Sequence, residues 1–311
     1  MGKIKSLIGY AKQLSKETEA WAIAFREKNE TPLYEGNPDG FSVLANNARY
    51  WKADPFLHTH DNKTYLFCEM YDRKKCKGVI GVARLSGSGC TRFRKCLETS
   101  THLSFPYLFE QDGEIYMMPE NGASGEIPVF RAVRFPYRWE KAYTVAPIPG
   151  MDTVPVPNDR DPSFFLTTVN QNTCLVRFRR GDSVWETVYE NKASARCAGR
   201  IIDDAGRLIR PSQNDEGRYG NSLHFNQIDD CSYEGYREHE ILRVLPPDSA
   251  CGEREISIGL REPAAVKYAG VHTYNCNSAY EVIDLPYYGA PNRIIFWKKR
   301  KKFIRHILKR L

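Results

Sequence analysis

The chain has 311 residues, of which 41% are hydrophobic and 27% charged, and its formal net charge is +7. This composition excludes disordered and fibrous proteins, and the length suits one large or two ordinary domains. No apolar run is long enough for a membrane-spanning helix, and the N-terminus lacks the apolar stretch and cleavage site of a secretory signal.

Nine cysteines occur, an odd number, and no two of them form a C-x-x-C pair. Disulfide scaffolds and zinc ribbons have different patterns. The cysteines therefore predict reduced thiols in a cytosolic protein.

The positive charge is concentrated at the C-terminus. Residues 293–311 contain nine Lys or Arg and no acid, and without these nine the chain has 36 basic and 38 acidic residues, a net charge of −2. A nearly neutral body argues against a nucleic-acid groove, so no nucleic-acid partner is expected.

The first segment has apolar residues at helical spacing, at positions 4, 7, 8, 11 and 14, and the stretch ETEAWAIAF continues this pattern. The spacing predicts a helix over residues 4–29. We expect residues 1–30 to form an N-terminal helical segment.

The pattern changes after residue 30 to a period of two, interrupted by Gly, Asn and Asp. HDNKTYLF, EQDGEIYMM and DDAGRLIR each predict two strands joined by a tight turn. GVIGVARL and IPVFRAV predict third strands, and RWEKAYTV predicts a fourth. Units of four strands are typical of propeller blades.

Two stretches resemble each other at an offset of 51 residues, WKADPFLHTHDNKTYLFCEMYD and THLSFPYLFEQDGEIYMMPENG. Pro55 then matches Pro106, and Glu69 matches Glu120. A fixed period of about 50 residues indicates a repeat architecture. Further units are expected at NDRDPSFFLTT, ARCAGRIIDDAGRLIRPSQN and HTYNCNSAYEVIDL.

The sequence therefore predicts an all-β fold, a five-bladed β-propeller over residues 31–290, with four or six blades as alternatives. The stretch FSVLANN is expected to add a strand to the last blade and close the ring, which removes exposed sheet edges.

Polar residues at equivalent points of the blades should converge at one mouth of a central funnel. The candidate catalytic residues are Asp54, Glu120 and Asp161. The candidate substrate-binding residues are Glu69, His102, Arg160, Arg196, Arg200, Arg210, Gln213 and His272.

Paired carboxylates suit glycosidic-bond chemistry, in which one protonates the leaving oxygen and the other stabilises or attacks the anomeric carbon. Clustered arginines clamp phosphate, which predicts a phosphorylated sugar donor or a lipid-phosphate acceptor. Purely structural roles are the alternative for these residues. Asp before Pro favours turns, and a Glu after an apolar run ends many strands. A lone His is often a hydrogen-bonding residue.

No cofactor and no metal is expected, because His and Cys are not clustered at metal-ligand spacing. A hydrated divalent cation on Asp54 or Glu69 stays open.

The C-terminal stretch RIIFWKKRKKFIRHILKRL predicts a basic amphipathic helix over residues 291–311. Such a helix lies in the headgroup plane of an anionic membrane surface, which places the protein in the cytoplasm, peripheral on the inner face of the membrane. A solvated cap helix and a nucleic-acid tail are the alternatives. The predicted membrane contacts are Phe296, Trp297, Lys298, Lys299, Arg300, Phe303, Ile304, Ile307 and Leu308.

At ADPFLH, HLSFPYLFEQDGEIYMMPE, VFRAVRFPYRWE and GRLIRPSQN the chain resembles the N-terminal domain of glucosamine inositolphosphorylceramide transferases and related bacterial polysaccharide-locus proteins. The resemblance covers roughly residues 45–285. It implies a propeller similar to those of arabinanase, xylosidase and invertase-type glycoside hydrolases, and a glycan-related role.

The hydrolase pattern is matched in part. Those enzymes place a carboxylate in the first blade, where Asp54 stands, and an Asp in the third, where the RDP motif with Asp161 stands. Their general-acid Glu lies in a later blade, whereas the fourth unit here offers RPSQN without a Glu, so Glu120 would have to substitute.

Three functions stay open on this sequence. The first is a membrane-associated sugar transferase acting on a glycan or lipid-linked sugar in surface polysaccharide or glycolipid biosynthesis. The second is a glycoside hydrolase, and the third is a non-catalytic glycan-binding propeller.

Overall fold

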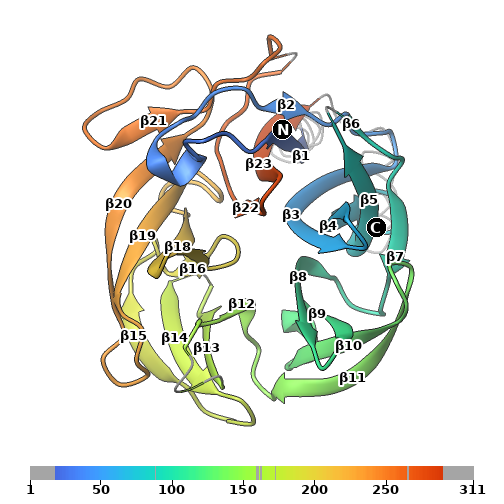
Figure 1. Ribbon diagram of the computed structural model, residues 1–311, viewed down its shortest axis with the longest axis vertical. Helices are drawn as coiled ribbons and strands as arrows, with labels where there is room; N and C mark the ends of the chain where they lie inside the picture. Colours follow the sequence, from blue (N-terminus) through green and yellow to red (C-terminus); the bar gives the residue numbers. More distant parts are fainter. Residues whose placement is uncertain are drawn as a thin grey trace, which may run out of the picture.

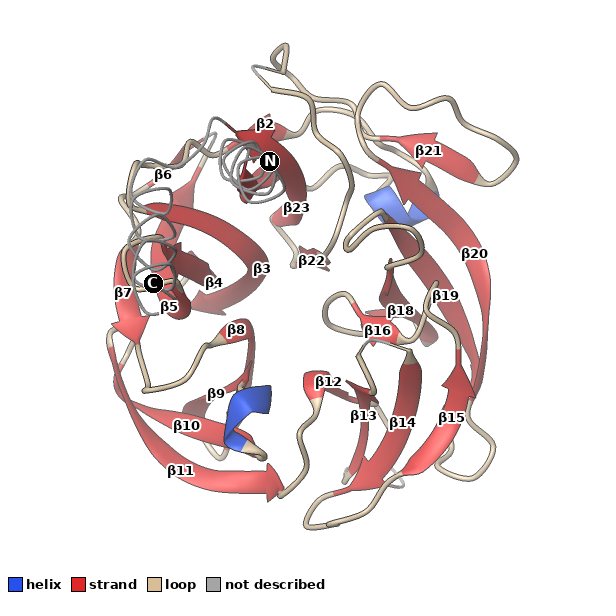
Figure 2. Cartoon of the chain, turned by 180° about the vertical axis from the view of Figure 1, so that it is seen from behind, coloured by secondary structure: helices blue, strands red, loops and turns tan. Residues whose placement is uncertain are grey.

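The computed structural model describes residues 18–87, 89–158, 161, 163–171, 173–264 and 266–289. Five sheets stand around a common centre, with β22, β3, β8, β12 and β16 nearest to it, and the reverse view shows the same ring (Figures 1 and 2). The prediction of a five-bladed propeller is confirmed. No helix within the described residues is long and apolar enough to cross a membrane.

The first two blades match the repeat seen in the sequence. Blade one has the order β3-β4-β5-β6, with β7 also paired to β5, and blade two has the order β8-β9-β10-β11. The predicted third and fourth strands are β5, β10 and β11. The bounds are β3 (Tyr50–His60), β4 (Lys63–Asp72), β5 (Lys77–Ser86), β6 (Gly89–Cys90), β7 (Arg94–Leu97), β8 (Ser104–Gln111), β9 (Glu114–Glu120), β10 (Ile127–Arg134) and β11 (Arg138–Ala146), with a 3-10 turn at Gly122–Ser124.

The third blade differs from the expected register. Its inner strand is β12, and Asn158 and Asp161 of the stretch NDRDP lie between β12 and β13 rather than on an inner strand. FFLTTV is therefore the second strand of this blade. The bounds are β12 (Met151–Pro155), β13 (Phe164–Val169), β14 (Cys174–Arg179) and β15 (Glu186–Glu190).

Blade four has β16 and β17 on its inner side, both paired with β18, followed by β19, β20 and β21. As predicted, it contains ARCAGR and RPSQN. The bounds are β16 (Arg196–Cys197), β17 (Ile202–Asp204), β18 (Arg207–Asn214), β19 (Ser222–Asp230), β20 (Arg237–Leu245) and β21 (Glu255–Ser257).

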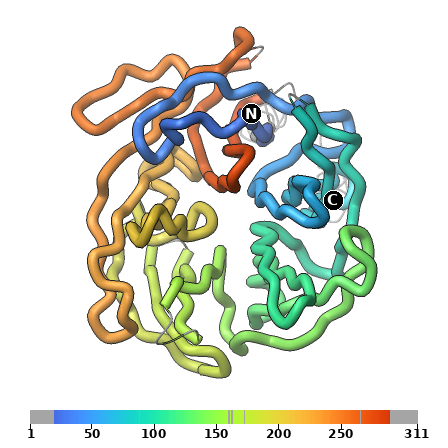
Figure 3. The backbone as a smooth tube through the Cα atoms, viewed as in Figure 1, coloured from blue at the N-terminus to red at the C-terminus, as the bar shows by residue number. Residues whose placement is uncertain are grey.

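Blade five joins the two ends of the chain, in the order β2-β1-β23-β22. Its strands are β22 (Tyr274–Cys276), β23 (Tyr280–Gly289), β1 (Thr18–Glu27) and β2 (Ser42–Val43), and a 3-10 turn at Leu33–Glu35 follows β1. Figure 3 shows the early, blue part of the tube beside the late, red part. The predicted strand in FSVLANN is confirmed as β2, but β1 supplies most of the closure.

The expected helix over residues 4–29 is wrong for residues 18–27, which form β1. This strand pairs antiparallel with β23 along its whole length, from Thr18 opposite Gly289 to Glu27 opposite Tyr280. Residues 4–17 of that expected helix, and the predicted helix over residues 291–311, lie outside the described residues.

A buried ion pair fixes the closure of the ring. Arg26 on β1 lies 2.6 Å from Glu281 on β23, and both side chains are almost fully buried. Glu281 also accepts hydrogen bonds from the backbone N–H of Leu33 and the hydroxyl of Tyr274. The donors offset the cost of burying the carboxylate, so the first and last strands are held in one register.

The predicted tight turns are present. Asp61 and Asn62 between β3 and β4 have φ of 49° and 56°, and Asp112 and Gly113 between β8 and β9 have φ of 52° and 76°. Two consecutive positive φ values are typical of the type I′ hairpin turn, which Asn, Asp and Gly tolerate.

A second backbone feature recurs on the inner strands of three blades. Asp54, Phe105 and Asp152 have φ of 49°, 43° and 49°, each beside a shift in the pairing with the second strand. Such β-bulges re-aim side chains. The bulges lie where the inner strands begin, which is also where the second strands end.

The hydrophobic core is a ring of contacts between blades. One cluster links the first four blades, a second links blades four and five, and a third packs Ile23 and Phe25 of β1 against Leu57 and Leu66 of blade one. All nine cysteines are unpaired, in agreement with the predicted thiols.

Candidate functional site

A cavity of about 190 Å³ opens at the centre of the ring, where the inner strands begin. It takes side chains from blades one, two, four and five, and we call it the central pocket. Its lining residues are Trp21, Trp51, Ala53, Asp54, Glu69, Tyr71, His102, Ser104, Glu120, Arg196, Tyr219 and His272. Six predicted site residues are therefore brought together: Asp54, Glu69, His102, Glu120, Arg196 and His272.

The second strand of each blade explains this convergence. Near its end it carries a polar side chain opposite the start of the inner strand: Glu69 pairs with Ala53, Glu120 with Ser104, and Gln213 with Arg196. Because the blades repeat around one axis, equivalent positions face the same mouth. Thr168 and Asp284 occupy the second strands of blades three and five and are fully buried.

Asp54 and His272 form one side of the pocket with Asp284 behind them. Asp284 accepts hydrogen bonds from the backbone N–H of Asp54 at 2.8 Å and of Thr273 at 2.7 Å. His272 Nδ1 lies 3.2 Å from Asp284 and 3.4 Å from Asp54, while Nε2 lies 2.9 Å from the Tyr219 hydroxyl. Asp54 Oδ2 accepts the backbone N–H of Phe105 at 3.2 Å.

Burial would by itself lower the pKa of His272, but Asp284 and Asp54 raise it to about 9. The imidazole is therefore a cation at neutral pH. Burial raises the pKa of Asp54 well above its usual range, against the effect of His272, and the nearby carboxylates of Asp284, Asp152 and Glu69 raise it further.

Glu120, Asp152 and Arg196 form the opposite side. Arg196 Nε lies 2.5 Å from Asp152, and its Nη2 lies 3.2 Å from Glu120. Asp152 also accepts a hydrogen bond from Gln213 at 2.9 Å. Asp152 is 1% exposed, whereas the Glu120 side chain is 16% exposed and reaches the pocket.

The pKa values of Glu120 and Asp152 are shifted in opposite directions. Burial and the negative charge of Asp152 raise the pKa of Glu120 well above its usual range, although Arg196 opposes this. Burial would raise the pKa of Asp152 too, but Arg196 and a hydrogen bond with Glu120 outweigh it and lower that pKa. A carboxyl group whose pKa is raised thus lies beside a carboxyl group whose pKa is lowered, and this is the arrangement that yields a general acid.

Glu69 and His102 lie at the rim on the side of blade one. Glu69 is 5% exposed, and its Oε1 lies 3.2 Å from Nε2 of His102, whose side chain is 44% exposed. Next to them Trp51 and Tyr71 stack with ring centroids 4.6 Å apart. Across the pocket, Trp21 lies 4.5 Å from the His272 ring. The pocket thus combines acids with aromatic faces.

Three predicted site residues lie elsewhere, for the following physical reasons. Asp161 lies beyond the inner strand of blade three, before its second strand, and there it pairs with Arg179 at 2.9 Å. Arg210 is fully buried and held by Glu238 at 2.8 Å and by the Tyr189 hydroxyl at 2.7 Å, between blades three and four.

Arg200 reaches blade two, where it donates to the Tyr107 hydroxyl at 3.0 Å and to the carbonyl of Leu108. Gln213 stands behind the pocket wall on Asp152. Arg160 lies outside the described residues.

The sequence interpretation missed Asp152, Asp284 and the aromatic residues of the pocket. The spacing gave no signal for Asp152, because positions 152 and 161 depart almost equally from the 51-residue offset that separates positions 54 and 105. Asp284, inside the apolar run of β23, gave no signal either.

Asp54, His272 and Asp284 are the described residues grouped closely enough to hold a metal ion, with candidate ligand atoms within 4.8 Å of one another. The His272 imidazolium already forms ion pairs with the carboxylates of Asp54 and Asp284. Oδ1 of Asp54 is buried, lies 3.4 Å from Nδ1 of His272 and accepts no hydrogen bond among the described residues.

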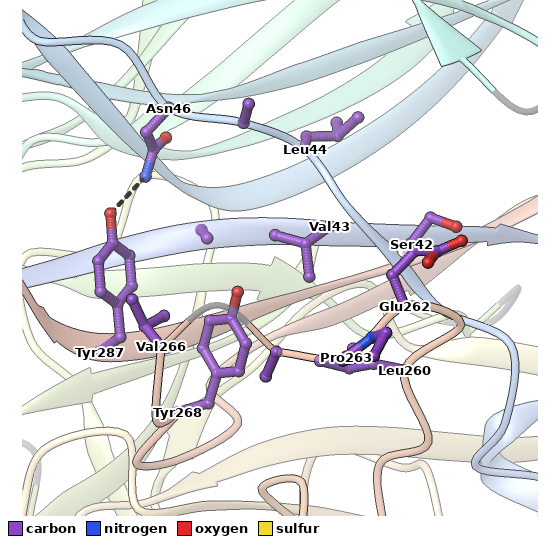
Figure 4. A pocket seen from close by; sticks show the side chains of 13 residues that line it. Ser42, Val43, Leu44, Asn46, Leu260, Glu262, Pro263, Val266, Tyr268 and Tyr287 are labelled. Carbon is purple, nitrogen blue, oxygen red and sulfur yellow. Dashed lines mark hydrogen bonds between the residues drawn. The ribbon is translucent and has the colours of Figure 1, made fainter.

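A second hollow, of about 350 Å³, lies at the outer side of blade five between residues 42–46 and 260–268 (Figure 4). Asn46 donates to the Tyr287 hydroxyl at 3.2 Å along its edge. Glu262 is the one acid among its lining residues, so this hollow lacks the paired carboxylates of the central pocket.

Comparison of the sequence with known proteins shows the protein family to which the chain belongs. The family model described as "Glucosamine inositolphosphorylceramide transferase 1, N-terminal" matches residues 42–261. Glucosamine inositolphosphorylceramide transferase 1 of Arabidopsis thaliana is 31% identical over 208 residues, which are 61% of this chain and 27% of that protein. The protein of the same name from Oryza sativa subsp. indica is 30% identical over 238 residues, 71% of this chain and 31% of that protein.

The chain thus spans less than a third of the length of these relatives. Solved structures with a similar outline include a beta-xylosidase, with a TM-score of 0.47 and 11% identity over 76% of this chain and 92% of that chain. An alpha-L-arabinofuranosidase catalytic domain from Coprinopsis cinerea has a TM-score of 0.47 and 11% identity over 88% of this chain and 98% of that chain.

Proposed function

Since the chain belongs to the family of the glucosamine inositolphosphorylceramide transferase 1 N-terminal domain, we propose that it exchanges a glycosidic bond in the central pocket and transfers a sugar residue to a glycan or lipid-linked acceptor. The observation that carries the proposal is the grouping of Glu120 and Asp152 around Arg196, with Asp54 in the same small cavity and with the pKa of Glu120 raised and that of Asp152 lowered. The names of the relatives support transfer as the reaction.

The reaction needs one proton donor and one proton acceptor. Glu120 gives its proton to the leaving oxygen as the bond from that oxygen to the anomeric carbon breaks. Burial raises the pKa of Asp54, but His272 stabilises the ionised form of this carboxyl group. The acceptor hydroxyl forms the new bond to the same carbon and loses its proton to that ionised form. Asp152 and Arg196 hold Glu120 in place, and solvent restores both carboxyl groups afterwards.

The phosphorylated donor stays a prediction with little support. A leaving phosphate needs a cation more than a proton donor. Among the described arginines that were predicted to bind phosphate, Arg196 alone lines the central pocket. Its guanidinium group already donates hydrogen bonds to Asp152 and Glu120. A glycosidic oxygen as the leaving group fits these contacts better.

Hydrolysis is the second candidate, because water can take the place of the acceptor hydroxyl between the same carboxyl groups. It would appear as release of free sugar without any acceptor. We also propose, from the basic C-terminal sequence, that the protein binds the cytoplasmic membrane surface as a peripheral protein, where a lipid-linked acceptor would be found.

The decisive experiment replaces the proposed acid. Purified Glu120→Gln and wild-type protein would be incubated with alkyl glycosides and with p-nitrophenyl glycosides, with and without an alcohol acceptor. We expect the variant to lose about 100-fold in rate on alkyl glycosides, and much less on p-nitrophenyl glycosides, whose leaving group needs no proton.

Asp161→Asn is the matched control, because it also neutralises a carboxylate, but one that pairs with Arg179 outside the pocket. It should leave the rate unchanged. Equal rates for Glu120→Gln and the wild type on alkyl glycosides would refute the proposal.

A further inference from the structure

The outer edge of blade one carries a positive charge that the nearly neutral body conceals. Residues 73–97 run from the turn after β4 through β5 and β6 to β7, and they contain eight Lys or Arg and no acid. The rest of residues 1–292 contains 28 basic and 38 acidic residues, a net charge of −10. Figure 1 shows β5, β6 and β7 at the rim of the ring, so this edge is the basic part of an otherwise acidic body.

Three of these cations gather around a single acid, Glu98, which follows β7. Lys75 Nζ lies 2.5 Å and Lys77 Nζ 3.5 Å from Oε1 of Glu98, and Lys95 pairs with Oε2. Hydrogen bonds from Lys75 and Lys95 lower the pKa of Glu98 to about 2, so this carboxyl group is ionised at neutral pH. We call Lys75, Lys77 and Lys95 the lysine cluster. Together with Glu98 it has a net charge of +2.

The cluster can bind a further anion without losing its present contacts. The side chains of Lys75 and Lys95 are each 46% exposed, and Glu98 is the hydrogen-bond partner found for either ammonium group among the described residues. An ammonium group has three N–H donors. Each of these two lysines therefore keeps donors that face solvent.

The lysine cluster lies on the side of the ring where the central pocket opens. Tyr71, near the end of β4, lines the pocket, and the turn with Lys75 follows directly. Lys77 donates to the backbone carbonyl of Thr99, three residues before His102, which also lines the pocket. A surface bound by the cluster would therefore lie near the mouth of the pocket.

The first and last strands reach this same side. His272 lines the pocket and comes just before β22, and β23 runs antiparallel to β22, past the pocket to Gly289, which pairs with Thr18. In the sequence, the basic and apolar segment of residues 293–311 follows. This segment thus continues from a residue on the side of the ring that carries the lysine cluster.

We propose that the lysine cluster is a docking surface for the anionic headgroups of a membrane, and that it turns the mouth of the central pocket toward the lipid layer. Headgroup phosphates and carboxylates accept charge-assisted hydrogen bonds from exposed ammonium groups. The same surface repels the acidic remainder of the body, so the ring docks by this edge. The inference goes beyond the peripheral binding proposed for the C-terminal segment, because it sets the orientation of the ring, and it does not depend on the glycosidic chemistry.

The first test compares two double variants of equal net charge. Lys75→Gln with Lys95→Gln, and Lys28→Gln with Lys63→Gln, each lower the charge of the full chain from +7 to +5. Lys28 follows β1 and Lys63 begins β4, at the strand ends away from the pocket. On vesicles of phosphatidylcholine and phosphatidylserine, we expect the cluster variant to bind about 25-fold more weakly than the wild type, about fivefold for each lysine, and the control variant to bind nearly as the wild type does.

Three results would overturn the inference. Equal losses in the two double variants would show that net charge alone decides binding. Unchanged vesicle binding of the cluster variant would show that the cluster does not touch the membrane. A cluster variant that binds vesicles as the wild type does but no longer binds a DNA duplex would assign the edge to nucleic acid instead.

Two exposed cysteines allow the orientation to be measured. Cys76 lies between Lys75 and Lys77, and Cys251 lies between β20 and β21 of blade four. A fluorophore would be attached to Cys76 in Cys251→Ser and to Cys251 in Cys76→Ser, and each protein would be bound to vesicles with spin-labelled headgroups. We expect stronger quenching at Cys76. Equal quenching at both positions, or stronger quenching at Cys251, would contradict docking by blade one.

The proposals fail separately. If the cluster variant loses vesicle binding while Glu120→Gln keeps full glycosidic activity, the docking surface stands and the bond-breaking proposal falls. If Glu120→Gln loses activity while the cluster variant binds vesicles as the wild type does, the reverse holds. The chain without residues 293–311 has a net charge of −2, so the cluster alone is not expected to hold it on vesicles.

Discussion

His272 is the residue through which the pocket affects the stability of the fold. It is 2% exposed, and both of its ring nitrogens have partners. An imidazolium in this position holds two carboxylates of different blades together, because Asp54 comes from blade one and Asp284 from blade five. The proton on His272 is therefore also a contact between blades.

This proton makes stability depend on pH. The pKa of His272 is about 9 in the folded chain and about 6.5 in an unfolded one, so its contribution is complete below pH 6.5 and is lost as the pH rises to 9. Its size is about 3 kcal/mol. In chemical denaturation between pH 6 and 9.5, His272→Gln should show a smaller fall in the free energy of unfolding than the wild type.

His60→Gln, at the exposed end of β3, is the control and should follow the wild type. A wild-type free energy of unfolding that is flat over this range, or a fall of equal size in His272→Gln, would contradict the role of the imidazolium.

At the scale of elements, β5 passes close to Glu69 and His102 at the rim of the central pocket, and Gly78 permits this close approach. A Cβ at this position would lie 2.6 Å from Oε1 of Glu69 and 2.7 Å from Nε2 of His102. We expect Gly78→Ala to lower the free energy of unfolding by about 1–3 kcal/mol, as overpacking does. The same change should weaken sugar binding, because Glu69 and His102 would be separated.

Gly89→Ala in the same blade is the matched control, since a Cβ there meets no atom within 4 Å. The melting temperatures of Gly78→Ala and Gly89→Ala, measured by thermal unfolding, compare the two variants directly. Similar effects of both substitutions would show that the close approach at Gly78 has no special importance.

Elements also show what the sequence could and could not predict. The hairpins were predictable, because Asp, Asn and Gly at the turns and alternation in the strands are local signals. The strand β1 could not be predicted, because its residues are buried on both faces of the sheet. Ile23 and Phe25 alternate with Ala22 and Ala24, and since alanine is also apolar, the sequence shows no period of two. Its strand conformation is imposed by β23, which lies far away in the chain.

The residues of the central pocket, too, could be predicted only where the sequence carries a local signal. Asp54, Glu69 and Glu120 were found because the first two blades keep one register. Asp161 was assigned by its local RDP motif, whereas Asp152 takes the equivalent place through a bulge that no motif marks. The roles of the arginines depend on partners such as Glu238, which only the folded ring brings near.

At the scale of the whole molecule, both chain ends leave the ring at one place. Thr18 at the start of β1 pairs with Gly289 at the end of β23. In the sequence, the basic segment follows Gly289, the residue that pairs with Thr18. Nine Lys or Arg residues, each worth about 1 kcal/mol near an anionic surface, would attach the entire ring at this side.

We expect the full chain to sediment with vesicles containing phosphatidylserine, less so as salt is raised, and not with vesicles of phosphatidylcholine alone. Removal of residues 293–311 should abolish sedimentation, whereas Glu120→Gln should leave it intact. Undiminished sedimentation of the shortened chain would disprove a membrane role for this segment.

The buried pair of Arg26 and Glu281 joins residues 255 positions apart. During synthesis β1 emerges first, and the residue that pairs with Arg26 follows 255 positions later. Until then the nascent chain must keep an apolar edge uncovered while four blades assemble. High contact order of this kind slows folding and exposes strand edges, so we expect the unfinished chain to aggregate more readily than the closed ring.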